Sequence, residues 1–153
     1  MSHIEICNNL WLGNQYSTKI FDGEYILSIG CNSLKSCANN IKLSIKDNED
    51  ADLTTILPDA LLFINKALNK NKKILVHCKG GINRSPAIII AYLVIEKLFT
   101  VEEAYVYVKN KKPSIRRKEH FMQDIIKYKN MIPETTYNTL LSKVIFVRLN
   151  ILL

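Results

Sequence analysis

One nine-residue segment, HCKGGINRS at positions 77–85, constrains the fold of this chain more than any other feature. It follows the apolar run 74–76, ILV, which has the character of a buried strand, and it precedes the apolar stretch PAIIIAYLVIEKL. Pro86 suits the first turn of a helix, where its missing N–H costs nothing. The order strand, tight loop, helix aims backbone N–H groups into one concavity beside a helix N-terminus, an arrangement that binds a phosphate dianion.

The side chains of this segment are those of a nucleophilic phosphate site. Cys78 would lie at the base of the loop, where amides and the helix dipole lower the pKa of its thiol from roughly 8.5, and a thiolate there can attack phosphorus. Arg84 supplies a planar fork for two phosphate oxygens. Ser85 is placed to donate a hydrogen bond to the sulfur or, alternatively, to cap the helix, and we expect His77 to orient the loop rather than act as a base. The other candidate phosphate contacts are Lys79, Gly80, Gly81, Ile82 and Asn83.

The remaining chain reads as alternating strands and helices. Residues 4–12, 25–29, 41–45 and 74–76 have strand character. Helices are predicted over 53–68, from Pro86, after Thr100, which forms a capping box with Glu103, and over 118–130. The expected fold is therefore a mixed α/β domain with a small central sheet and helices on both faces.

Composition fits one compact domain without a metal or disulfide framework. The 153 residues are 48% apolar and carry a net charge of +7, which indicates an anionic partner. The four cysteines have no zinc-site spacing and are too few for a disulfide scaffold, so an intracellular setting is expected, cytoplasmic with a nuclear one left open. The N-terminus lacks a signal pattern and the apolar runs are too short to span a bilayer. Nucleic-acid binding is not expected, since no recognition motif accompanies the positive charge.

The segment HCKGGINRSP resembles the phosphate-binding signature of cysteine-dependent protein phosphatases, in the form used by dual-specificity phosphatases. NLWLGN, YILSIG and TVEEAYVYVKNKKP are similar to further parts of that family, so the resemblance covers about residues 4–130. It implies a mostly parallel sheet of about five strands flanked by helices, no metal or cofactor, and hydrolysis of phosphotyrosine and phosphoserine or phosphothreonine on proteins through a cysteinyl-phosphate intermediate. We expect a catalytic domain over 1–133 and an apolar extension over 134–153.

The resemblance also implies a carboxylic acid on a separate loop, which protonates the leaving oxygen and later activates water. The polar loop KDNEDAD offers Asp47, Glu49, Asp50 and Asp52. In the family the acid directly follows the third short strand, about thirty residues before the cysteine, and Asp47 has that position. Asp50 is the alternative, and Asp52 is expected to cap a helix.

Several features of the sequence leave alternatives open. Ser28 stands where the family commonly has Asn, so one hydrogen bond that braces the loop is expected to be weaker. Lys79 and the basic run 116–118 also suit phosphoinositides or the 5′ phosphates of RNA, and a catalytically dead phosphoprotein-binding module is a further possibility. Cys31 or Cys37 is a candidate redox partner of Cys78. The extension 134–153 is expected to pack on the domain or on a second subunit in a homodimer.

Overall fold

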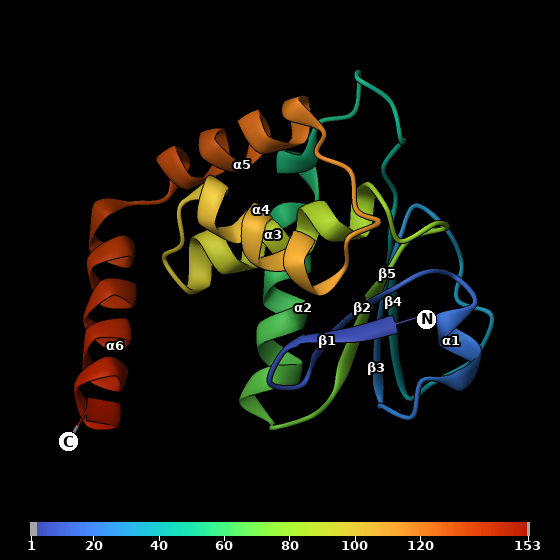
Figure 1. The fold of residues 1–153 in the computed structure, drawn as a ribbon, viewed down its shortest axis with the longest axis horizontal. Helices are drawn as coiled ribbons and strands as arrows, with labels where there is room; N and C mark the ends of the chain where they lie inside the picture. Colours follow the sequence, from blue (N-terminus) through green and yellow to red (C-terminus); the bar gives the residue numbers. More distant parts are fainter. Residues whose placement is uncertain (1–2, 153) are drawn as a thin grey trace.

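The computed structural model describes residues 3–152, and the side chains of residues 3–146 (Figure 1). Five strands form one sheet in the order β1-β2-β5-β3-β4. Strands β1 and β2 are antiparallel, whereas β2, β5, β3 and β4 pair in parallel, so the predicted mostly parallel sheet is confirmed. The strands are β1 (His3–Cys7), β2 (Leu10–Gly13), β3 (Tyr25–Ile29), β4 (Asn39–Leu43) and β5 (Ile74–His77).

Two of the predicted strands differ in detail. Residues 4–12 form two strands rather than one, because the chain turns back at Asn8 and Asn9. Asn9 has φ of 68°, a left-handed conformation that asparagine tolerates better than most residues. The strand expected at 41–45 begins and ends two residues earlier, where its backbone pairs with β3 in register.

The helices follow the predicted order. They are α1 (Ser17–Ile20), the 3₁₀ turn η1 (Leu53–Thr55), α2 (Leu57–Asn69), α3 (Arg84–Glu96), α4 (Val101–Lys111), α5 (Glu119–Met131) and α6 (Glu134–Leu152). The helix predicted over 53–68 is divided into η1 and α2, and Pro58 lies in the first turn of α2. The capping box of Thr100 and Glu103 at the start of α4 is confirmed.

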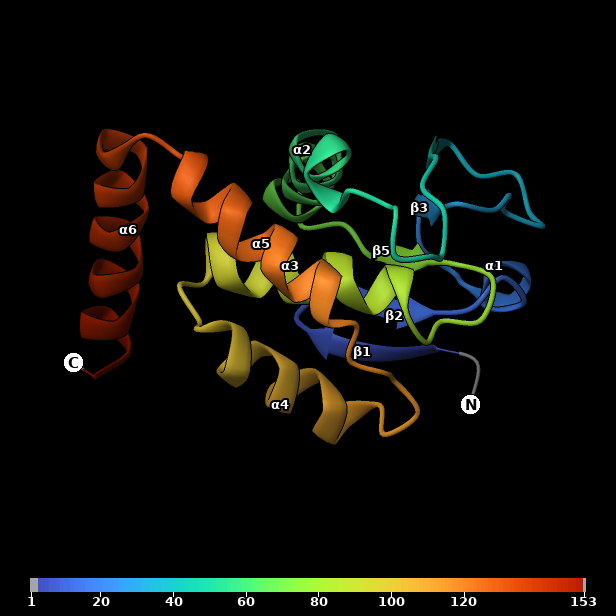
Figure 2. The same cartoon turned by 90° about the horizontal axis from the view of Figure 1, so that it is seen from above.

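The two faces of the sheet are covered unequally. Helices α2, α3, α4 and α5 gather on one face, and α3 runs through the middle of this layer with every residue from 85 to 95 buried (Figures 1 and 2). The opposite face carries a smaller cluster of Phe21, Ile26 and Leu75 beside the short helix α1. Helices therefore lie on both faces as expected, but the main core is on one of them.

The parallel strands bring their carboxyl ends to the same edge of the sheet. There, β2 ends at Gly13, β3 leads into Gly30, β4 leads into the loop 46–52, and β5 leads into Cys78. Open parallel sheets place their binding sites at this edge. Segments far apart in the sequence thus meet around the HCKGGINRS loop.

The C-terminal segment is helix α6, which lies at the end of the molecule away from the sheet (Figures 1 and 2). No side chain of α6 within residues 134–146 is buried, and Leu141, Ile145 and Phe146 are exposed. The side chains of the rest of the extension 134–153 lie outside the described residues. Among the described residues, no helix is long and apolar enough to cross a membrane.

Candidate active site

Cys78 lies at the base of the loop between β5 and α3, with 2% of its surface exposed. Its Sγ accepts hydrogen bonds from the Gly81 N–H and the Ser85 hydroxyl, each at 3.2 Å. Burial acts to raise the pKa of the thiol, but the hydrogen bonds from Ser85 and Gly81, together with the charge of Arg84, outweigh it and lower the pKa below its ordinary value. The site therefore favours a thiolate.

Ser85 faces the sulfur rather than capping the helix. Its hydroxyl is buried, lies 3.4 Å from the Gly13 carbonyl oxygen and donates to Cys78 Sγ. Helix α3 has Asn83 as its N-cap residue, and no side chain accepts a capping hydrogen bond there. A hydroxyl held in this way can donate to a thiolate, which only accepts.

His77 is a buried link between β5 and β3. Its Nδ1 lies 3.4 Å from the carbonyl oxygen of Cys78, which can only accept, so Nδ1 is the donor and Nε2 accepts from the Ser28 hydroxyl at 2.7 Å. Burial lowers the pKa of His77 to about 4, partly opposed by the bond to Cys78. His77 is thus neutral at physiological pH and holds the strand end, and the Ser28 hydroxyl makes a short hydrogen bond to it, although Ser28 was expected to brace the loop only weakly.

The two candidate redox cysteines have different surroundings. Cys31 Sγ lies 3.7 Å from Nδ1 of His77, and His77 is the residue that precedes Cys78. Cys37 donates to the Asn39 carbonyl oxygen at 3.3 Å and packs against the smaller apolar cluster. Cys31 is thus placed beside the loop, and a redox role for it stays a prediction.

Arg84 is held by backbone carbonyl groups from two other loops. Its Nη1 donates to the carbonyl oxygens of Gly30 at 3.3 Å and Ile45 at 3.4 Å, and 11% of its side chain is exposed. Gly30 has φ of 69°, and a Cβ atom there would collide with the Arg84 guanidinium. The glycine therefore leaves the space that the guanidinium occupies.

Asp47 is brought to the HCKGGINRS loop from the end of β4. Both carboxylate oxygens accept from Asn83 Nδ2, at 3.3 and 3.2 Å, and Oδ2 lies 3.8 Å from Arg84 Nε. The other acidic candidates have no such contact: Asp52 accepts from Thr54 as the N-cap of η1, while Glu49 and Asp50 are exposed. The geometry therefore joins Asp47, and not its neighbours, to Arg84.

Two further contacts to the HCKGGINRS loop were not predicted, because no local sequence pattern indicates them. Lys112 Nζ donates to the Gly81 carbonyl oxygen at 2.5 Å, and the Arg116 N–H donates to the Ile82 carbonyl oxygen at 3.0 Å. Burial lowers the pKa of Lys112, and the nearby Cys78 opposes this shift. The chain after α4 thus supports the loop from outside, a contact that depends on tertiary packing. The side chain of Lys79 is exposed in the loop.

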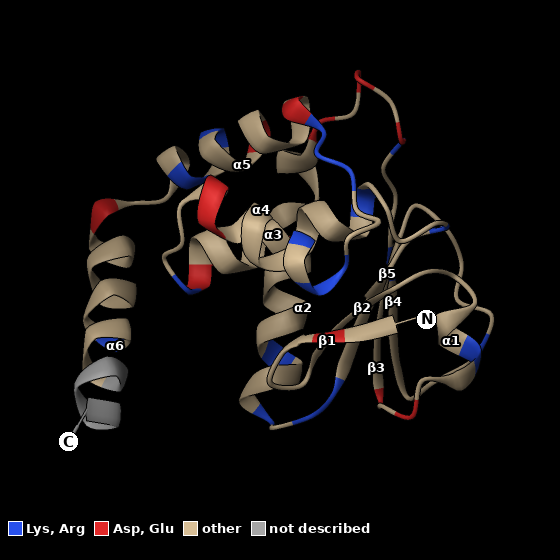
Figure 3. Cartoon of the chain, viewed as in Figure 1, with Lys and Arg blue, Asp and Glu red and all other residues tan. Residues whose placement is uncertain are grey.

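Charges of both signs border this edge of the molecule. Figure 3 shows acidic residues along the loop 46–52 and a basic run in the connection into α5, residues 116–118. Among the described residues, no group of three histidine, cysteine, aspartate or glutamate side chains could hold a metal ion. The chemistry that the site can perform with these residues is nucleophilic attack with acid–base assistance.

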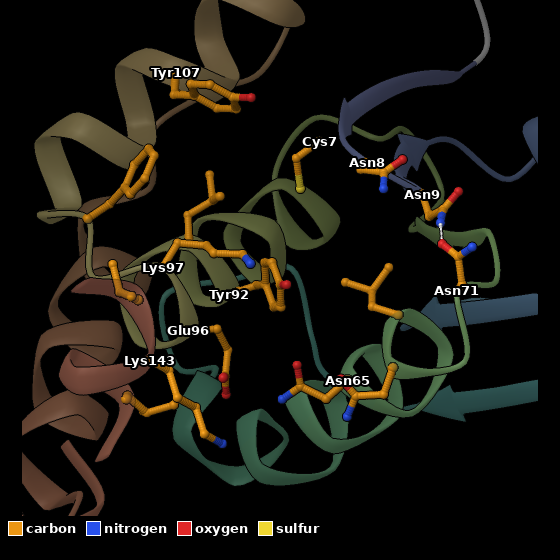
Figure 4. Close-up of a pocket in the computed structure, with 16 residues that line it drawn as sticks. Cys7, Asn8, Asn9, Asn65, Asn71, Tyr92, Glu96, Lys97, Tyr107 and Lys143 are labelled. Atoms are coloured by element: carbon orange, nitrogen blue, oxygen red, sulfur yellow. Dashed lines mark hydrogen bonds between the residues drawn. The ribbon is translucent and has the colours of Figure 1, made fainter. Parts of the chain in front are cut away.

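A cavity of about 740 Å³ lies elsewhere, between α6 and the helical layer (Figure 4). It is lined by the β1–β2 turn, the C-terminal ends of α2 and α3, Phe99, Tyr107 of α4, and Leu140, Lys143 and Val144 of α6. None of its lining residues belongs to the HCKGGINRS loop. It is thus separate from the candidate active site.

Comparison with known proteins places this geometry in a family context. The family model described as dual specificity phosphatase, catalytic domain, matches residues 10–131. Human dual specificity protein phosphatase 5 is 29% identical over 144 residues, which cover 88% of this chain and 38% of the relative. The Caenorhabditis elegans tyrosine-protein phosphatase vhp-1 is 28% identical over 138 residues, which cover 83% of this chain and 21% of the relative. The chain thus spans less than half the length of these relatives.

Solved structures share the fold. The crystal structure of DUSP15 superposes with a TM-score of 0.80 at 19% identity and covers 92% of this chain and 96% of its own. The human tyrosine phosphatase-like serine/threonine/tyrosine-interacting protein gives a TM-score of 0.78 at 23% identity, with 85% and 97% covered. At these identities the likeness establishes the fold.

Proposed function

The chain belongs to the dual specificity phosphatase family, and on that premise we propose that it hydrolyses phosphotyrosine and phosphoserine or phosphothreonine monoesters on proteins. The observation that carries the proposal is the convergence of three groups at one edge of the sheet. The Cys78 thiol with its lowered pKa and the Arg84 guanidinium come from the HCKGGINRS loop, and the Asp47 carboxyl comes from the loop after β4.

The proposed reaction has two balanced steps. The Cys78 thiolate attacks phosphorus, the bond from phosphorus to the substrate oxygen breaks, and Asp47 gives its proton to that oxygen. Water then attacks the cysteinyl phosphate and gives a proton to Asp47, the phosphorus–sulfur bond breaks, and inorganic phosphate leaves. Arg84 and the loop amides hold the phosphoryl oxygens in both steps, and Ser85 stabilises the departing thiolate.

The first experiment measures hydrolysis of phenyl phosphate in reductant and chelator, with wild type, Cys78→Ser and Asp47→Asn. We expect Cys78→Ser to be inactive and Asp47→Asn to be slower by about 10² to 10⁴, the usual contribution of general acid–base catalysis. Glu49→Gln, in the same loop, is the matched control and should keep wild-type activity. Activity that persists in Cys78→Ser would overturn the proposal.

A second measurement separates the rival functions. One similar structure carries the name tyrosine phosphatase-like, so a phosphoprotein-binding module without catalysis is a distinct outcome. Phosphopeptides, phosphoinositides and RNA with a 5′ triphosphate should be compared as substrates, because the exposed Lys79 suits all three. Turnover of the phosphopeptides supports the proposal. Binding of phosphopeptides without turnover by the reduced wild type would instead indicate the binding module.

A further inference from the structure

The side chain of Asn83 reaches from the HCKGGINRS loop, residues 77–85 and here called the phosphate loop, to the loop 46–52 that carries Asp47. A phosphate bound in the loop needs only the backbone N–H of this residue, so the side chain is free for another task. Its Nδ2 donates to Oδ1 and Oδ2 of Asp47 at 3.3 and 3.2 Å. Asn83 is partly buried, whereas 37% of the Asp47 side chain is exposed, so the more buried residue holds the more exposed one.

The other contact of Asp47 is weaker and has a competing use. Arg84 Nε lies 3.8 Å from Asp47 Oδ2, which is beyond hydrogen-bond distance. A phosphate group in the loop draws on the free N–H groups of the same guanidinium, since its Nη1 is already taken by Gly30 and Ile45. The contact from Asn83 does not depend on the guanidinium and can persist while substrate is bound.

We infer that Asn83 is a positioning residue that holds Asp47 at the mouth of the phosphate loop, within reach of the leaving-group oxygen. A neutral amide suits this task because Asp47 must alternate between its protonated and ionised forms. The N–H of the amide can donate to a carboxylate or to the carbonyl oxygen of a carboxylic acid, so it holds both forms. This inference rests on the proposed function.

The test compares two substrates that differ in their need for an acid. Phenyl phosphate has a poor leaving group that must be protonated, whereas dinitrophenyl phosphate releases a stable phenolate without help. Asn83→Ala should lower kcat/KM, which reports only the step that releases the leaving group, by about tenfold on phenyl phosphate, the value of one hydrogen bond to a charged group, and leave kcat/KM on dinitrophenyl phosphate unchanged. Glu49→Gln should change neither rate, and inhibition by inorganic phosphate should be the same in all variants.

A double variant completes the test. Asn83→Ala should have no further effect on phenyl phosphate hydrolysis once Asp47→Asn is present, because the residue that it positions is gone. Equal losses on both substrates, or losses that multiply in the double variant, would overturn the inference and place Asn83 in phosphate binding.

A readout without turnover separates this inference from the proposed function. Amide hydrogen exchange in residues 47–52 should be faster in Asn83→Ala than in wild type or Glu49→Gln, because the loop loses its anchor. Unchanged exchange would contradict the inference even if catalysis by Cys78 is established. Faster exchange together with an active Cys78→Ser variant would retain the anchor and reject the phosphatase mechanism.

Discussion

At the scale of single residues, the reactivity of Cys78 depends on donors that outweigh its burial. The Ser85 hydroxyl is the first of these donors, and it stabilises the thiolate rather than the thiol. Ser85→Ala should therefore raise the pKa of Cys78 and slow release of the phosphoryl group from sulfur. The pH dependence of Cys78 alkylation by iodoacetamide measures the first effect, with a midpoint below roughly 8.5 in wild type and a higher one in the variant. Equal midpoints would contradict the assigned role.

Gly30 shows that a residue without a side chain can determine where a functional group lies. A Cβ atom at this position would meet the Arg84 guanidinium and would lie 2.7 Å from the Ile45 carbonyl oxygen. With φ of 69°, Gly30→Ala should lower the free energy of unfolding by about 2 kcal/mol or more, measured by urea titration. Gly80→Ala is the matched control because its Cβ would make only ordinary contacts, at 3.7 and 3.8 Å from Ile82. Similar stabilities of the two variants would refute this explanation.

At the scale of elements, the end of β5 is joined to β3 by the hydrogen bond between His77 and Ser28. The pKa of His77 is lowered to about 4 in the fold, against about 6.5 in an unfolded chain, so the unfolded chain binds more protons between these values. The contribution of neutral His77 to the free energy of unfolding is therefore complete above pH 6.5 and is lost as the pH falls toward 4. We expect His77 to contribute a loss of about 2 kcal/mol between pH 7.5 and pH 5.

Denaturant unfolding at the two pH values tests this expectation. His77→Asn should be less stable than wild type at pH 7.5, yet its stability should fall less between pH 7.5 and pH 5. The difference between the losses of stability in the two proteins isolates His77 from the carboxylates that titrate in both. Equal losses between pH 7.5 and pH 5 would show that His77 does not cause the pH dependence.

The elements of this fold differ in how well local sequence predicts them. The strand, loop and helix around Cys78 are encoded by an apolar run, glycines and Pro86, and the start of α4 is encoded by its capping box; these predictions hold. The limits of β4 were predicted less well because they are set by pairing with β3, which is a tertiary contact.

The same distinction applies to the site. The HCKGGINRS motif identified Cys78 and Arg84 because both residues lie in one short segment of the sequence. The support from Lys112, the two carbonyl groups that hold Arg84 and the link from Asn83 to Asp47 join segments that are 31 or more residues apart. Such contacts depend on the order of the strands in the sheet, which local patterns do not specify.

At the scale of the whole molecule, α6 is the part whose apolar surface exceeds what its own domain covers. Leu140 and Val144 line the cavity beside the domain, while the adjacent Leu141 and Ile145 are 37% and 48% exposed and Phe146 is 66% exposed. A helix with apolar residues on several sides is normally buried. The outer face of α6 is thus an exposed apolar surface, and the open cavity behind the same helix is lined by both apolar and polar side chains.

A second copy of this chain can cover the outer face of α6 and fill the cavity at the same time. The α6 of each copy would place its outer apolar face in the cavity of the other, which gives a closed two-fold dimer rather than an open chain. Charged residues of both signs, Glu96, Lys97 and Lys143, border the cavity. The predicted homodimer would therefore form through residues 134–153, away from Cys78.

Sedimentation velocity over a range of concentrations tests this dimer. Wild type should sediment as a dimer that dissociates on dilution, whereas the double variant Leu141→Glu, Ile145→Glu should remain a monomer because it would bury two unpaired charges. Thr136→Glu with Thr139→Glu adds the same charge to exposed positions of the same helix and should still dimerise. A monomer at every concentration of wild type, or a dimer that survives the first double variant, would exclude α6 as the interface. Hydrolysis of an aryl phosphate per chain should be equal in all three proteins, because the cavity shares no residue with the phosphate loop.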